Sequence, residues 1–221
     1  MSMEKLRLAL TILVAAAAIA GEAHASSIVS NFSGPGVSGS LMLTYGTATD
    51  AKYPNAYEVT GISGTFSDSN NSLHIVNATV GSLVPITHDT PDPTNLLAPH
   101  DFSRFAVASG LPSNTHGLLT YDNLFYPGGS PPTASDYTAH GGFLDIYGLM
   151  FKIGDGGEVV DLWSNGAGSN GVVDYGVAVA TSSVALDYVV GGVSVPEPDS
   201  FWLIGSGLLG MLAWRRYAAT A

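Results

Sequence analysis

The sequence contains no cysteine, and it has few basic residues. Without cysteine an exported chain gains no disulfide and has no thiol chemistry, so packing alone must hold its fold together. Its 7 lysines and arginines stand against 18 aspartates and glutamates, which gives a net charge of −11 at pH 7. Such an acidic surface repels phosphate backbones. Nucleic acid is therefore not an expected partner.

The chain also lacks two hydrolase signatures, the Gly-x-Ser-x-Gly elbow and the His-Glu-x-x-His pair. His88 and His100 each precede an aspartate. We interpret them as solvated loop residues, with metal ligation and acyl transfer as the alternatives. Glycoside hydrolysis needs two facing carboxylates, and a chain with this many acids nominates no particular pair. The sequence predicts a protein that is not an enzyme and has no cofactor.

The N-terminal 25 residues have the three parts of a secretory signal peptide. These parts are a basic start at Lys5 and Arg7, an apolar run over 8–20, and Ala23 and Ala25 directly before Ser26. Small residues at those two alanine positions are typical of a cleavage site. We therefore predict a signal helix over 1–25 that is removed before Ser26. An uncleaved anchor helix is the alternative, and the short apolar run argues against it.

Residues 26–194 have the composition of an exported β domain. Short apolar stretches recur between turn-forming residues, and several alternate with period two, which is typical of antiparallel strands with one buried face. We predict one jelly-roll-like antiparallel β-sandwich with no helix. The expected strands are 27–32, 37–45, 57–67, 73–85, 116–125, 142–153, 159–164, 172–180 and 184–190.

Turn residues in this domain predict two hairpins and two long loops. Residues 68–71 and 155–157 are rich in Asp, Asn and Gly, which accept φ > 0, so each should join the strands on either side of it. Residues 86–115 and 126–141 are rich in proline or glycine and predict irregular loops. Loops of that length in a compact domain are either functional or loosely ordered.

Two sets of residues in the domain are candidates for binding a ligand. Tyr126 and Trp163, with neighbouring aromatic residues Tyr121, Phe125 and Tyr137, could form a platform that stacks on sugars, although core packing is the interpretation we favour. Asp155 and Asp161, with Glu158 between them, could supply oxygens to Ca²⁺. A regular strand would place Glu158 on the opposite side, so no metal site is predicted.

The C-terminal residues 195–221 contain three parts in a fixed order. They are the tripeptide Pro196, Glu197 and Pro198, an apolar run over 201–214, and the pair Arg215 and Arg216. Prolines remove backbone donors, so the tripeptide should be extended and accessible. The apolar run predicts a transmembrane helix with the arginines on the cytoplasmic side. Fourteen residues span only about 21 Å of the roughly 30 Å of hydrocarbon. A buried core helix is the alternative.

These three parts together resemble the PEP-CTERM sorting signal of bacterial surface proteins. The resemblance implies that exosortase, a membrane-embedded protease-like transpeptidase, cuts near Pro196, Glu197 and Pro198 and that the tail holds the precursor transiently in the inner membrane. Residues 61–83, 121–131 and 161–166 look like segments of one group of such ectodomains, which implies a shared sandwich core.

By the same resemblance, the protein would reach the cell surface or extracellular matrix of a Gram-negative bacterium and have a structural part in biofilm, in association with exopolysaccharide. The alternatives are a carbohydrate- or calcium-binding module and, third, a polysaccharide hydrolase.

Overall fold

The computed structural model describes residues 25–70, 74–86, 106–107, 119–132, 140–155, 158–181 and 187–195. These residues form eleven strands and no helix. The strands are β1 (Ser26–Gly34), β2 (Val37–Thr49), β3 (Tyr57–Asp68), β4 (Ile75–Leu83), β5 (Ala106–Val107), β6 (Thr120–Tyr121), β7 (Leu124–Phe125), β8 (Leu149–Ile153), β9 (Glu158–Ala167), β10 (Val173–Ala180) and β11 (Asp187–Val193).

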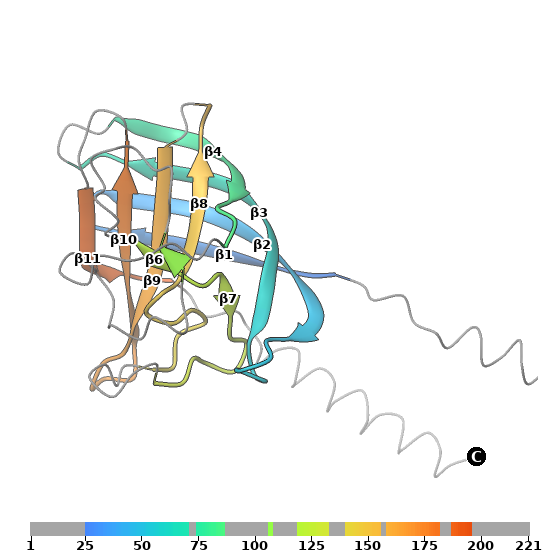
Figure 1. The fold of residues 1–221 in the computed structure, drawn as a ribbon. Coiled ribbons are helices and arrows are strands. Elements are labelled where there is room, and N and C mark those ends of the chain that lie inside the picture. The colour runs from blue at the N-terminus through green and yellow to red at the C-terminus, as the bar shows by residue number, and fades with distance from the viewer. Residues whose placement is uncertain are drawn as a thin grey trace, which may run out of the picture.

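The strands form one large antiparallel sheet in the order β1-β2-β3-β4-β8-β9-β10-β11, and β7 pairs with β3. A small second sheet joins β5 to β6. The large sheet curls into a half-barrel, in which β1–β4 lie across from β8–β11 (Figure 1). The prediction of an all-β antiparallel fold is confirmed. The signal helix and the C-terminal transmembrane helix were predicted in segments that lie outside the described residues.

A single continuous sheet takes the place of the two separate sheets that a sandwich requires. The connection is the pairing of β4 with β8, in which Val80 lies opposite Ile153 and Leu83 opposite Phe151. Because adjacent strands are rotated relative to one another, a sheet of many strands coils until its two halves face each other. The apolar faces of both halves then meet in one core.

The first half, β1–β4, is buried on one face only. Its inward residues include Phe32, Leu41 and Phe66, which are at most 3% exposed. The opposite face, which we call the outer face, carries small uncharged polar residues in cross-strand rows. One row is Asn31, Ser40, Thr65 and Thr79, and another begins with Ser33, Ser38 and Ser67.

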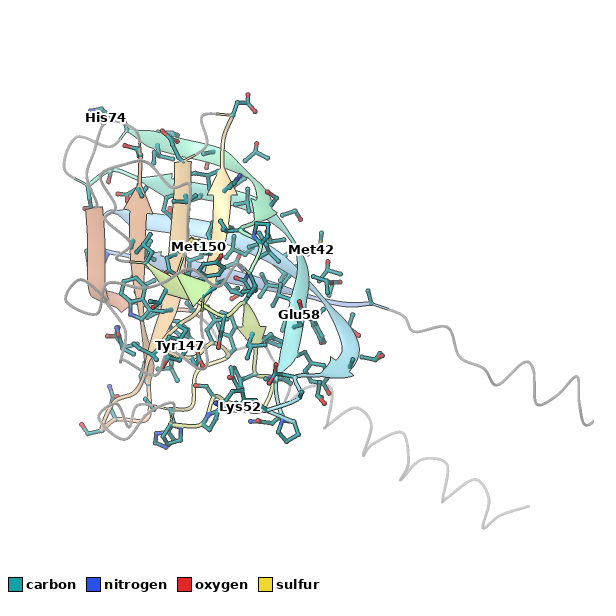
Figure 2. The ribbon with its side chains drawn as sticks, viewed as in Figure 1. Met42, Lys52, Glu58, His74, Tyr147 and Met150 are labelled. Atoms are coloured by element: carbon teal, nitrogen blue, oxygen red, sulfur yellow. The ribbon has the colours of Figure 1, made fainter. Side chains whose placement is uncertain are left out.

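The second half is buried on both faces along β8–β10. Leu162 and Val177 face the first core, between the two halves of the sheet, whereas Trp163 and Ala178 face a second core. Residues 119–132 and 140–148, which we call the cover segment, close the second core from outside. Met150 of β8 and Tyr147 of the cover segment belong to it, and both are fully buried (Figure 2).

The two predicted hairpins are present, because β3 pairs with β4 and β8 pairs with β9. The predicted strands 116–125 and 142–153 are broken, however. Asp122 Oδ1 accepts a hydrogen bond from the N–H of Leu124 at 3.1 Å, and Asp145 Oδ1 accepts one from the N–H of Tyr147 at 2.9 Å. Such side-chain bonds to the backbone two residues on compete with sheet pairing and form turns. The cover segment is therefore a series of turns with two short strands, β6 and β7.

Candidate functional site

The C-terminal end of the described domain is fixed to the first strand. The N–H of Ser33 donates to the carbonyl of Ser194 at 3.0 Å, and the N–H of Ser194 donates to the carbonyl of Ser33 at 2.8 Å. Val193 and Val195 are 1% and 5% exposed in the first core, while both serines are exposed. The chain is therefore held against the β domain immediately before Pro196.

Glycine lets β11 come close to the end of β1. A Cβ atom on Gly34 would lie 2.8 Å from Val193 Cγ2 and 3.0 Å from Val193 Cα, closer than side chains tolerate. The turn that follows is held from the side of β3, where Asn70 Nδ2 donates to the carbonyl of Pro35 at 2.9 Å. We call Ser33, Gly34 and residues 193–195 the seam.

The predicted signal-cleavage site lies at the other end of β1. Ala25 is exposed, and Ser26 is the first residue of the strand, opposite Tyr45 of β2. A cut between them would leave the whole of β1 in the sheet. Ala23 lies outside the described residues.

Other predicted functional residues also lie outside the described residues. They are Pro196, Glu197, Pro198, Arg215 and Arg216 at the C-terminal end, and His88 and His100 in the segment predicted as a loop. In the part of the chain that the structure describes, no helix is long and apolar enough to cross a membrane.

The aromatic residues proposed as a sugar platform are covered by protein. Tyr126 is 0% exposed and Trp163 is 6% exposed. The hydroxyl of Tyr126 donates to Asp145 Oδ2 at 3.3 Å, and Trp163 Nε1 donates to Asn165 Oδ1 at 3.0 Å. Tyr121 and Phe125 are buried too, and Tyr137 lies outside the described residues. In this conformation the described rings pack against protein, and their binding of a glycan stays a prediction.

The acidic residues proposed as calcium ligands are not gathered in one place. Asp155 is exposed in the turn after β8, whereas Asp161 is 3% exposed within β9. Among the described residues, no group of three His, Asp or Glu side chains is arranged to hold a metal ion. The described geometry therefore gives the calcium alternative no ligand set.

Asp161 instead belongs to a pair of buried carboxyl groups that the sequence analysis did not identify. It lies between Val159 and Trp163 on the second-core face, and its register neighbours are Met150 and Ala178. Its Oδ1 has no hydrogen-bond partner. Burial, and then the negative charge of Asp145, raise the pKa of Asp161 well above its usual 3.8. A neutral carboxylic acid is thereby favoured in the second core.

Asp145 approaches from the cover segment and is much better satisfied. Its Oδ1 accepts from the N–H groups of Tyr147 and Gly148 at 2.9 and 3.3 Å, in addition to the bond from Tyr126 to Oδ2. Its carbonyl accepts from the N–H of Ser164 in β9 at 2.8 Å, which ties the cover segment to the sheet. The available signal was an acid inside each of two apolar runs, at 143–147 and 159–163. The bonds of Asp145, and not the pair of carboxyl groups, are what hold the cover segment in place.

Comparison with protein families identifies the C-terminal segment. The family model of the PEP-CTERM protein-sorting motif matches residues 194–216. No curated protein and no solved structure matches the chain. The motif implies an exported protein of a Gram-negative bacterium that exosortase recognises and processes at the membrane. The chain therefore carries a PEP-CTERM protein-sorting motif whose first two residues, Ser194 and Val195, also belong to its folded β domain.

Proposed function

We propose that this protein is a non-enzymatic component of the cell surface or extracellular matrix, delivered by exosortase and associated there with exopolysaccharide in biofilm. The observation that carries the proposal is the sorting motif at 194–216, joined without a linker to a β domain. The domain lacks cysteine and has an acidic balance, which suits a soluble protein outside the cell. The lack of cysteine and the acidic charge both suit a structural role, which needs no catalysed reaction.

Each part of the C-terminal segment has its own role in this proposal. Pro196, Glu197 and Pro198 form the element that exosortase recognises. The apolar run over 201–214 holds the precursor temporarily in the inner membrane, for which its short length is sufficient. Arg215 and Arg216 keep the tail on the cytoplasmic side by the positive-inside rule.

The test replaces Pro196, Glu197 and Pro198 with alanine in the full chain, expressed in its natural host. We expect the full-length form to accumulate in the membrane fraction and the shorter form to disappear from the surface, as followed by immunoblotting. Asp155→Ala, at an exposed acid outside the motif, is the control and should be processed normally. Unchanged size and location of the triple-alanine variant would contradict sorting through this motif.

A second candidate function is the binding of neutral polysaccharide by the outer face of β1–β4. Its rows of Ser, Thr and Asn offer hydroxyl and amide groups that both donate and accept hydrogen bonds. β1, β2 and β4 contain no charged residue at all, which suits an uncharged partner. Val29 lies opposite Met42 near the centre, and both are exposed, at 58% and 44%.

A glycan array probed with the purified mature protein would test this binding. Thr65→Lys places a long charged side chain in the middle of one row and should abolish the signal from neutral glycans. Thr49→Lys, at the exposed last residue of β2, adds the same charge outside the rows and should leave the signal unchanged. Repeating the array with EDTA separates this candidate from a calcium-dependent module, because only the latter would lose binding.

A further inference from the structure

The seam places a restraint directly beside the sorting tripeptide. Proteases bind their substrates as extended chains, with residues on both sides of the cut lying in the cleft. Ser194 and Val195 immediately precede Pro196, yet they are held by two hydrogen bonds to Ser33 and by burial of Val195. An enzyme that binds the tripeptide and the residues before it must therefore separate them from the domain.

The seam is also a part of the sheet that few backbone hydrogen bonds hold closed. β1 pairs with β2 along its whole length, from Ser26 opposite Tyr45 to Gly34 opposite Val37. Among the described residues, its backbone pairing with the C-terminal end is a single bridge, between Ser33 and Ser194, beside which Gly34 packs against Val193. Proteins open locally where few bonds must be broken, without global unfolding. Release of residues 194–195 requires loss of this bridge and exposure of one valine side chain.

We infer that opening of the seam regulates exosortase processing, so that the precursor is cut through the conformation in which residues 193–195 have left β1. This inference rests on the proposed function, because it concerns the same processing site. When opening and closing are fast compared with cleavage, the cleavage rate follows the population of the open form. Changes on the β1 side of the seam, at Ser33 or Gly34, should then change the processing rate while residues 194–216 stay intact.

The first test opens the seam from a position far from the motif in sequence. Gly34→Ala introduces a Cβ atom against Val193, so Val193 must shift away from the end of β1. We expect the precursor to be processed about tenfold faster in a pulse–chase experiment, because overpacking of this kind shifts a local equilibrium by that order. Gly128→Ala is the matched control, because its Cβ atom would meet nothing within 4 Å.

The second test locks the seam. Ser33 and Ser194 exchange both backbone hydrogen bonds, and such pairs have Cα atoms about 5.5 Å apart, within the range of a disulfide. The chain has no other cysteine, so the double variant Ser33→Cys, Ser194→Cys can form no other disulfide within one molecule. We expect oxidised precursor to be processed at least tenfold more slowly than either single variant. An added reductant should restore the rate.

The outcomes separate this inference from the proposed function. Faster processing of Gly34→Ala together with a reversible block in the locked variant supports regulation by the seam. Wild-type rates in both, with processing still lost when Pro196, Glu197 and Pro198 become alanine, overturn the regulation and leave sorting intact. Processing that ignores the tripeptide overturns the proposed function itself. Should Gly34→Ala fail to accumulate, the locked variant alone decides, because a disulfide at an existing pair does not require the domain to rearrange.

Discussion

The two halves of the curled sheet differ in how many of their faces are covered. β1–β4 pack one face on the first core and leave the outer face open to solvent, whereas β8–β10 are buried between two cores. The sequence follows this difference, because β1 and β2 alternate between apolar and polar residues and β9 contains six consecutive buried residues. A strand covered on both faces has no side on which a polar group can reach water.

That difference leaves fewer polar groups buried in the first half, where Ser30 and Asp68 are the buried polar residues of β1–β4 among those described. In the first half, small polar side chains occupy the outer face, where water satisfies them. In the second half, Asp161 occupies a covered face, and its Oδ1 has no hydrogen-bond partner. Three pairs of substitutions measure this contrast, beginning with the largest expected effect.

The two methionines Met150 and Met42 provide the most direct comparison. Met150 is fully buried in the second core, and Met42 is 44% exposed on the outer face (Figure 2). Met150→Ala should lower the free energy of unfolding by about 2–5 kcal/mol, because it leaves a cavity. Met42→Ala should change it by less than about 0.5 kcal/mol. Denaturant titration of the two mature variants measures both, and equal losses would contradict a packed second core.

Asp161→Asn tests the pH dependence of the covered half. Because the folded pKa is raised above the unfolded value of 3.8, the folded state holds the proton more tightly. Stability therefore falls as pH rises from about 3.8 through the raised pKa. Facing groups on the cover segment include Asp145 and Tyr147, while the register neighbours Met150 and Ala178 add no charge.

We expect the wild type to lose stability relative to Asp161→Asn as the pH is raised, and the two curves to converge in acid. A buried polar atom that lacks a partner costs about 1–3 kcal/mol, and more when it is charged. Thermal unfolding across this pH range measures the difference. Asp155→Asn, at an exposed acid, is the control. Parallel curves for wild type and Asp161→Asn would show that the carboxyl group is not held neutral.

The smallest contrast compares two glycines. A Cβ atom on Gly176 would collide with the indole ring of Trp163, in the covered half, whereas one on Gly61 would meet Thr44 Cβ at an ordinary 3.4 Å, on the outer face. Gly176→Ala should destabilise the mature protein by about 1–3 kcal/mol. Gly61→Ala should be neutral or stabilising by up to about 1 kcal/mol. Urea midpoints compare the two, and a tolerated Gly176→Ala would indicate that the indole ring moves freely.

The alternation of apolar and polar residues made the strands of the first half predictable from sequence. Expected strands at 27–32, 37–45 and 57–67 correspond to β1, β2 and β3 with small changes at their ends. Period two specifies which side chains face inward, but it contains no information on which strand neighbours which. The pairing of β4 with β8, and hence one curled sheet in place of a sandwich, depends on contacts between residues distant in sequence.

The second half was harder to predict because turns interrupt its apolar runs, and the apolar pattern alone does not indicate where. Asp122 and Asp145 each bond to the backbone two residues on, and Asn123 and Gly148 adopt positive φ of 53° and 73°, so the cover segment turns where a strand was expected. The sorting motif, by contrast, is a local pattern and was recognised from its own residues. The pairing of Ser194 with Ser33, by contrast, joins residues far apart in sequence. No local sequence pattern could have predicted it.

The single bridge between Ser33 and Ser194 also sets an order of events during synthesis and export. β1 and β2, β3 and β4, and β8 and β9 are neighbours in sequence and can pair as soon as each hairpin emerges. Closure of the first strand on the last residues of the domain joins positions 33 and 194, the greatest sequence separation among the strand pairings of the described residues, and contacts of long separation form slowly. It must wait until residue 194 has crossed the membrane, so closure reports that the entire domain has been delivered.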